Sequence, residues 1–195
     1  MADHRYGSQS TAKRGSSRAF AILGTTGFLV LAPGTVAGLV PWVISRWQMH
    51  PPLLGFTPFR AIGVLLIAAG IAIVLESFAR FALRGIGTPA PAFPTQHLVV
   101  SGLYRYVRNP MYVGVLSINL GQGLWLGNRG VLVYAGFVWL AMHLFVVRYE
   151  EPTLRRTYGA EFELFFKSVP RWIPRLTPWH AGSKRASAGV RINPN

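Results

Sequence analysis

Four long apolar runs dominate the pattern of hydrophobic and polar positions along the chain. They cover residues 19–45, 59–83, 110–127 and 130–148, and charged residues only bound them or interrupt them near an end. A helix needs roughly 20 mostly apolar residues to cross the hydrocarbon core of a bilayer. The pattern therefore predicts an all-α membrane protein with about four transmembrane helices.

The connections within this pattern add two expectations. Only Asn128, Arg129 and Gly130 separate the last two runs, which predicts a tight antiparallel helical hairpin. Pro33 and Pro41 lie inside the first run, and because proline has no N–H they predict a kink or a break there. The first run also exceeds the apolar core of about 7–15 residues in a cleaved signal peptide, so we expect it to remain as a span.

Composition supports the membrane class. Of 195 residues, 51% are hydrophobic and 13% are charged, whereas soluble domains average roughly 25% charged residues. The sequence contains no cysteine, which excludes disulfides, thiolate catalysis and zinc sites built on Cys. We expect one membrane domain over residues 19–176, with a disordered basic segment, 1–18, before it and a flexible basic tail, 177–195, after it.

Charge predicts the topology. The chain has 20 Lys and Arg against 6 Asp and Glu, a net charge of +14. With both termini cytoplasmic, 17 of the 20 basic residues lie inside, and only Arg46, Arg60 and Arg129 lie outside. This split follows the positive-inside rule. The excess charge thus indicates orientation and contact with anionic lipid, not binding to nucleic acid.

The predicted cytoplasmic loop, 84–109, and the residues just after it hold candidate chemistry. The stretch contains His97, Gln96, three Tyr and three Arg, a density that a plain linker does not need. Ligand-binding groups concentrate on loops held by a rigid scaffold. A basic, aromatic belt at the membrane interface has the same composition, so both interpretations stay open at this point.

A second candidate is the adjacent pair Glu150 and Glu151, just before Pro152. We expect the fourth helix to end here, and carboxylates oppose the macrodipole at a helix C-terminus. Adjacent helical residues point about 100° apart, so one Glu can face the bundle while the other faces the tail. The alternative is that the pair neutralises nearby arginines.

Three further polar sets carry two interpretations each. Glu76 and Arg80 are four residues apart, which suits either an intramembrane functional carboxylate or a structural ion pair. Tyr112 and Asn119 share one helix face, and His143 shares another with Glu150. These residues line an internal site or form helix–helix hydrogen bonds, and we favour the hydrogen bonds for Asn119 and His143.

Taken together, these residues resemble a known signature. The motifs are His97-x4-Gly102-Leu103-Tyr104, Arg108-Asn109-Pro110-Met111-Tyr112, Tyr149-Glu150-Glu151-Pro152 and Val169-Pro170-Arg171-Trp172-Ile173-Pro174. Over about residues 59–176 the chain resembles the integral-membrane isoprenylcysteine carboxyl methyltransferases and the related phospholipid methyltransferases. The carboxyl branch usually has His where this chain has Asn109 and Pro where it has Leu103, so the motifs are divided between the two branches.

The resemblance implies S-adenosyl-L-methionine as cofactor. It places the cofactor against residues of the loop and hairpin, with the carboxylate pair closing the pocket: His97, Leu98, Val99, Gly102, Tyr104, Arg108, Pro110, Tyr112, Glu150 and Glu151. An arginine can bind the cofactor's carboxylate and a glutamate its diol or ammonium group. No metal site is predicted.

The implied reaction is methyl transfer to a lipid or prenylcysteine-like acceptor whose tail stays in the bilayer. Arg148 and Arg171 are the cations best placed to hold an anionic headgroup, and with Glu151 they form the candidate catalytic set. Two alternatives are an NADPH-dependent membrane reductase of related fold and a non-enzymatic membrane scaffold.

Overall fold

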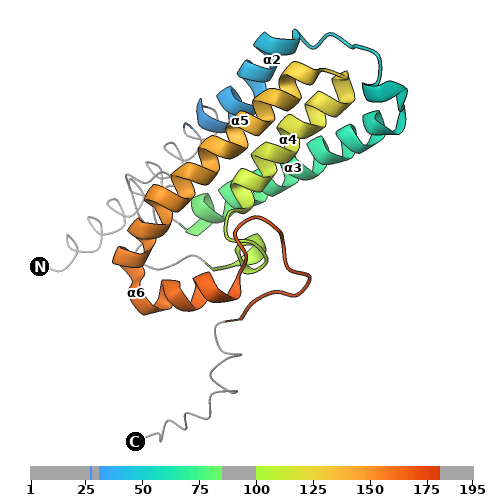
Figure 1. Ribbon diagram of the computed structural model, residues 1–195. Coiled ribbons are helices and arrows are strands. Elements are labelled where there is room, and N and C mark those ends of the chain that lie inside the picture. The colour runs from blue at the N-terminus through green and yellow to red at the C-terminus, as the bar shows by residue number, and fades with distance from the viewer. Residues whose placement is uncertain (1–26, 28–30, 85–99, 181–195) are drawn as a thin grey trace, which may run out of the picture.

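The computed structural model describes residues 27, 31–84 and 100–180, and its regular elements are all helical (Figure 1). No strand occurs within those ranges. The α-helices are α2 (Val40–Ser45), α3 (Pro58–Arg84), α4 (Pro110–Leu126), α5 (Arg129–Phe145) and α6 (Glu151–Ser168). Short 3-10 turns cover Leu53–Gly55 and Gly102–Arg105, and π turns cover Thr35–Leu39 and Val146–Glu150. We call the last two the first and the second π turn.

The predicted hairpin is confirmed. The helix α4 ends at Leu126, and Gly127 takes the left-handed conformation, with φ +65°, that commonly terminates a helix. The next residue, Asn128, caps α5 because its side-chain oxygen accepts a hydrogen bond of 3.1 Å from the N–H of Val131. Two residues therefore reverse the chain between antiparallel helices.

Paired glycines bring α3 and α4 unusually close together. A Cβ atom added to Gly63 would lie 2.6 Å from the carbonyl oxygen of Gly121, and one added to Gly70 would lie 2.6 Å from that of Gly114. Each helix spaces its two glycines seven residues apart, so the pairs stack along an antiparallel interface. Small residues let helix backbones approach in this way inside membranes.

The first helix runs through both of its prolines instead of breaking. The described residues are helical from Leu31 to Ser45, and the first π turn lies between Pro33 and Pro41. Because Pro41 has no N–H, it cannot bond the carbonyl of Ala37 at the α spacing or that of Val36 at the π spacing. Side chains from other helices bond both carbonyls instead: Gln122 Nε2 donates to Ala37 at 2.7 Å, and Tyr134 donates to Val36 at 2.9 Å.

The last helix corrects a sequence expectation. The helical backbone does not end at Glu150 but continues from α5 through the second π turn into α6. Glu151 therefore lies inside a continuous helical run, as the first residue of α6, and not at a helix C-terminus. At Gly159, with φ +51° and ψ −123°, α6 kinks, and its second part crosses the end of the bundle (Figure 1).

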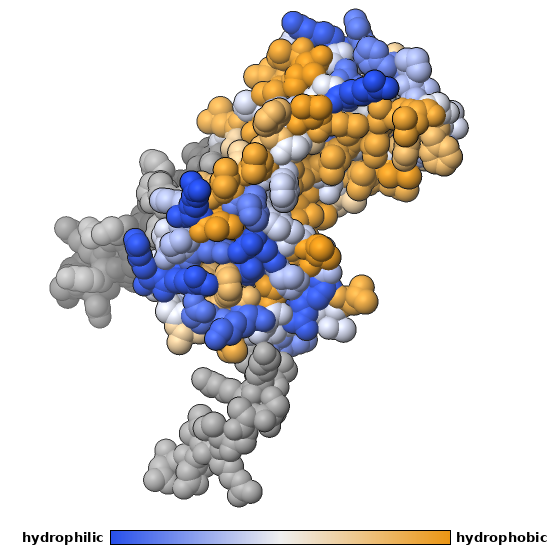
Figure 2. Space-filling view, in the orientation of Figure 1, coloured by the Kyte–Doolittle hydropathy of each residue, from blue (hydrophilic) through white to orange (hydrophobic). Residues whose placement is uncertain are grey.

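Two of the described helices are long and apolar enough to cross a membrane: Pro58–Arg80 and the run Arg129–Ser168. Only 28% and 22% of their most apolar windows are buried, so most of these side chains face outward, as lipid-facing side chains do. Figure 2 shows an apolar band between two more polar ends. The helix α4 is shorter and carries buried Asn119 and Gln122, which suits an inner position.

Candidate functional site

Two segments far apart in sequence pair with each other beneath the bundle. These are residues 105–109, which we call the loop segment, and residues 169–180, which we call the tail segment (Figure 1). Their backbone hydrogen bonds are Arg108 N–H to Pro170 O at 2.9 Å, Arg175 N–H to Tyr106 O at 3.0 Å and Trp179 N–H to Arg105 O at 2.9 Å. The Nδ2 group of Asn109 also donates to Arg171 O at 3.2 Å. The tail segment is thus held against the start of α4.

A small apolar core anchors the tail segment to α6. It consists of Phe162, Phe165, Val169 and Trp179, all of them buried. The rings of Phe165 and Trp179 lie 5.7 Å apart in a tilted contact. Large aromatic side chains bury much apolar surface, and this burial stabilises the contact between α6 and the tail segment. This core therefore fixes the backbone that carries the polar groups of the tail segment.

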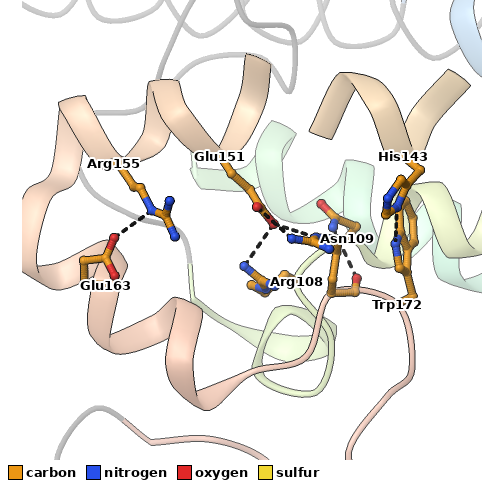
Figure 3. Close-up of polar contacts among 8 residues, drawn as sticks. Arg108, Asn109, His143, Glu151, Arg155, Glu163 and Trp172 are labelled. Carbon is orange, nitrogen blue, oxygen red and sulfur yellow. Dashed lines mark hydrogen bonds and ion pairs between the residues drawn. The ribbon is translucent and has the colours of Figure 1, made fainter. Parts of the chain in front are cut away.

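The carboxylate of Glu151 binds two arginines (Figure 3). Arg171 of the tail segment donates twice, from Nε at 2.7 Å and from Nη2 at 2.9 Å. Arg108 of the loop segment places its Nη1 3.1 Å away. The Glu151 side chain is only 9% exposed, and this bidentate bond raises the pKa of Arg171. One buried acid therefore ties α6, the loop segment and the tail segment together.

The guanidinium of Arg108 is incompletely satisfied. Its side chain is 9% exposed and stacks over the ring of Phe166, with 4.1 Å between Cζ and the ring centroid. Although Nη1 forms the ion pair with Glu151, neither Nη1 nor Nε has a hydrogen-bond partner among the described residues. Burial lowers the pKa of Arg108, and the Glu151 charge partly offsets that effect. Buried N–H groups without acceptors are costly, and a ligand oxygen can satisfy them.

The second carboxylate points elsewhere. The hydroxyl of Tyr112 in α4 donates to Glu150 Oε2 at 3.0 Å. Glu150 therefore faces the bundle while Glu151 faces the tail, as the helical geometry predicts. Both oxygens of Glu151 are occupied by Arg171, whereas only one oxygen of Glu150 has a hydrogen-bond partner among the described residues.

The 3-10 turn Gly102–Arg105 brings Tyr104 to the same area. Tyr104 has a side-chain hydrogen bond with Ser77 of α3, and burial raises its pKa, with further contributions from the charges of Glu150 and Glu76. Gly102 has a φ of +53°, and a Cβ there would collide with the guanidinium of Arg80. Arg80 in turn pairs with Glu76, so the i,i+4 ion pair is formed and supports this turn.

The tail segment also inserts Trp172 into the bundle, and this contact corrects a sequence expectation. Its indole N–H donates to His143 Nδ1 at 3.2 Å (Figure 3), and its ring lies 6.5 Å from that of Tyr112. His143 thus bonds the tail and not another helix. Asn119 likewise donates to Val115 O of its own helix, at 3.1 Å. Neither of these bonds is the helix–helix bond that we expected.

The structure brings together most of the predicted site residues that it describes, with one exception. Arg148 is exposed on the second π turn and makes no hydrogen bond or ion pair within the described ranges, so it lies apart from the Glu151–Arg171 pair. Pro110 is the first residue of α4 and is buried. The predicted ligands His97, Leu98 and Val99 lie outside the described residues. Trp172 was not predicted as a site residue, although it lies within the quoted tail motif.

The cavity between the side chains of this site is small. A cavity of about 30 Å³ lies among Arg108, Asn109, Glu150, Glu151 and neighbouring apolar residues. Sites for cofactor-sized ligands usually measure about 300–1,000 Å³, so this cavity alone is too small for one. No group of three or more His, Cys, Asp or Glu in the described ranges is arranged to hold a metal ion.

Comparison with known proteins places the sequence in a family. The sequence pattern of the phospholipid methyltransferase family matches residues 59–161, which is 103 of the 195 residues. The chain belongs to the phospholipid methyltransferase family. Arg108, Tyr112, Glu150 and Glu151 all lie within the matched segment, whereas the tail segment lies beyond it.

Two curated relatives match a larger share of the chain than the family pattern does. The chain is 31% identical over 152 residues to the protein-S-isoprenylcysteine O-methyltransferases of Mus musculus and Rattus norvegicus, matching 72% of this chain and 50% of each relative. It is 36% identical over 80 residues to the Schizosaccharomyces pombe enzyme of that name, matching 40% of this chain and 34% of the relative. The chain therefore spans about half the length of the mammalian relatives. No solved structure matches it.

Proposed function

We propose that the protein transfers a methyl group from S-adenosyl-L-methionine to a lipid or prenylcysteine-like acceptor held in the membrane. The observation that carries this proposal is the unsatisfied, buried guanidinium of Arg108 beside two carboxylates, inside the segment that matches the family. The name of the curated relatives supplies one acceptor class, a prenylated cysteine, and the name of the family supplies the other, a phospholipid.

The donor set suits this cofactor, which carries a carboxylate, an ammonium group, a ribose diol and a sulfonium. Arg108 offers unpaired N–H groups to a carboxylate, and Glu150 offers its remaining carboxylate oxygen to a diol or ammonium group. We assign Glu150 to the cofactor and Glu151 to the loop and tail segments, because Arg171 already occupies both oxygens of Glu151. Bound there, S-adenosyl-L-methionine supplies an electrophilic methyl group on its sulfur.

The other predicted residues take supporting roles in this proposal. The faces of Tyr104 and Tyr112 suit a cationic sulfonium. Gly102 leaves room for the Arg80 side chain, and Pro110 fixes the start of α4. His97, Leu98 and Val99 complete the proposed pocket from the adjoining loop. Arg148, exposed at the surface, is proposed to meet an anionic headgroup, while Arg171 holds the carboxylate of Glu151.

The chain's own contribution to the reaction is then alignment, electrostatics and exclusion of water. A carboxylate acceptor is already ionised at neutral pH and needs no base. An amine acceptor must lose a proton; the candidates to receive it are Glu150 and, if its Nδ1 gives up the bond from Trp172, His143. The two acceptors therefore differ in pH dependence, with a nearly flat rate for the carboxylate and a rate that rises with pH for the amine.

We further propose that four helices span the membrane with both termini in the cytoplasm. At 1.5 Å per residue, the 17 residues of α4 extend about 25 Å, close to the bilayer core of about 30 Å. The 17-to-3 split of basic residues supports the orientation. Tags at residues 1 and 195 should both resist an external protease in intact cells, and cleavage of either would contradict this topology.

Transfer of tritiated methyl groups tests the activity directly. The full chain in detergent is incubated with labelled S-adenosyl-L-methionine and, separately, with phospholipids or with a farnesylated cysteine analogue. We expect label in one acceptor class, with the pH profile of that class. Binding of NADPH in place of the methyl donor would contradict the proposal, and so would binding of neither.

A further inference from the structure

A second cavity lies at the end of the bundle opposite the carboxylate pair. It opens between the connection from α2 to α3 and the hairpin turn from α4 to α5, both at the top of Figure 1. Its volume is about 400 Å³, within the range of ligand sites. It is lined by His50, Pro51, Pro52, Leu53, Leu54, Gly127, Asn128 and Arg129. None of these residues takes part in the site described above.

Hydrogen bonds and close packing fix the walls of this cavity. The N–H of His50 bonds Leu126 O at 2.9 Å, and Nη2 of Arg60 bonds His50 O, also at 2.9 Å. Gly127 lies so near the carbonyl of Pro51 that a Cβ there would collide with it. The two walls are therefore joined through the backbone, and the opening between them is not a chance gap between mobile loops.

The charged residues at this end of the bundle are all basic. Arg46, Arg60 and Arg129 lie here, whereas all six acidic residues of the chain lie elsewhere in the sequence: Asp3, Glu76, Glu150, Glu151, Glu161 and Glu163. Arg129 is exposed and forms no hydrogen bond or ion pair through its side chain with any described residue. The Nε atom of Arg60 is buried without a hydrogen-bond partner in the described ranges. Guanidinium groups in this state suit an anion, above all a phosphate.

Exposed apolar side chains surround the cavity. Trp47 is 60% exposed, Leu54 89% and Phe56 52%. Trp47 and Leu54, like Arg46, hold positive φ angles of 48–54°, which non-glycine residues rarely adopt and which persist only where the surroundings enforce them. Aromatic and apolar side chains beside basic ones are typical of the boundary between headgroups and acyl chains.

We propose that this cavity binds the phosphate of an anionic phospholipid in the leaflet at this end of the protein. Arg129 and the N-terminal end of α5 provide the positive charge and His50 lines the same cavity, while Leu54 and Phe56 contact the acyl chains. A soluble phosphate would meet the same cations but gain nothing from the apolar side chains. The inference does not depend on methyl transfer, because no residue is shared with the proposed active site.

Native mass spectrometry of the full chain in neutral detergent, titrated with phosphatidylglycerol, tests this proposal. Arg129→Gln should weaken binding about five-fold, the effect of roughly one interfacial charge. Arg129→Lys should retain most of the affinity. The matched control is Arg156→Gln, an exposed arginine of α6 that also lacks a side-chain partner among the described residues, and it should leave the affinity unchanged.

Three outcomes would overturn the proposal. If Arg129→Gln and Arg156→Gln weakened phosphatidylglycerol binding equally, the effect would depend on overall charge and not on the cavity. If phosphatidylcholine bound as tightly as phosphatidylglycerol, the cavity would have no preference for an anionic lipid. Displacement of phosphatidylglycerol by glycerophosphate at equal concentration would assign the cavity to a soluble phosphate.

Discussion

The first and the last helices of this protein share one backbone arrangement but use it differently. The first π turn ends at Leu39, two residues before Pro41, and the second ends at Glu150, two residues before Pro152. In both, the extra residue of the π turn and the missing N–H of proline leave two carbonyls without their usual helical partners. The two π turns therefore have the same position relative to a proline.

Their surroundings decide what each turn does. At the first, side chains from α4 and α5 bond the carbonyls of Val36 and Ala37, so the irregular turn becomes part of the packing. At the second, the corresponding residues, Val147 and Arg148, are exposed, and the carboxylates at the end of the turn bond α4 and the tail segment. The first π turn therefore fixes the packing of its helix, whereas the second π turn directs the two carboxylates to different partners.

The largest expected effect is on the second turn. Glu151→Gln leaves Arg108 and Arg171 as buried or half-buried cations without their acid and should cost about 3 kcal/mol of stability. Glu163→Gln is the matched control, because it breaks an ion pair whose side chains are 44% and 41% exposed and should cost under about 1 kcal/mol. Thermal unfolding in detergent measures both. Equal losses would show that Glu151 does not hold the two segments together.

The next effect concerns affinity instead of stability. Glu150→Gln removes a charge-assisted hydrogen bond and should weaken binding of S-adenosyl-L-methionine about 10- to 150-fold, equivalent to about 1.5–3 kcal/mol. Tyr112 can still donate to the amide oxygen, so the fold should survive. Isothermal titration against Glu161→Gln, an exposed glutamate of α6, supplies the measurement. Wild-type affinity in both variants would remove Glu150 from the proposed pocket.

At the first turn, the expected effect is on stability alone. Gln122→Leu leaves the carbonyl of Ala37 without its donor in a buried position and should cost about 1–3 kcal/mol. Tyr134→Phe should cost less, because that hydroxyl is only partly buried. Cofactor affinity should stay at the wild-type value in both variants. A loss of affinity would mean that the two turns are coupled.

The smallest effects come from the prolines. Pro41→Ala and Pro152→Ala each return an N–H to the helix, and each should change stability by less than about 1 kcal/mol. Only Pro152→Ala should weaken cofactor binding, because a regular α-turn would rotate Glu150 away from Tyr112. On the same samples, thermal unfolding followed by circular dichroism measures stability, and isothermal titration measures cofactor affinity. Weaker binding in Pro41→Ala would contradict this difference.

Sequence periodicity predicted the described helices well, because long apolar runs leave few alternatives in a bilayer. It misplaced the end of the last helix, because the apolar run ends at residue 148 although the helical backbone continues into α6. Proline is tolerated in the first turn of α6, and the π turn absorbs the disturbance before it. Helical geometry alone indicated that the two glutamates diverge.

The contacts of the site were harder to predict. The bond between Glu151 and Arg171 joins residues 20 apart, across the kink at Gly159, and the bond from Trp172 to His143 joins residues 29 apart. Both depend on where the tail segment folds back, which no local pattern encodes. The facing glycines of α3 and α4 were likewise missed, because the match between Gly63 and Gly121 appears only when the helices are aligned antiparallel.

The pairing of the loop and tail segments also sets an order of events during synthesis. Arg108 leaves the ribosome 63 residues before Arg171 and 43 before Glu151. At about 5–20 residues per second, the gap to Arg171 corresponds to roughly 3–13 seconds. Throughout that interval the Arg108 side chain has neither its acid nor the tail backbone that later covers it. The nascent hairpin can therefore enter the bilayer early, while the pocket that we propose for the cofactor becomes complete only among the last steps of folding.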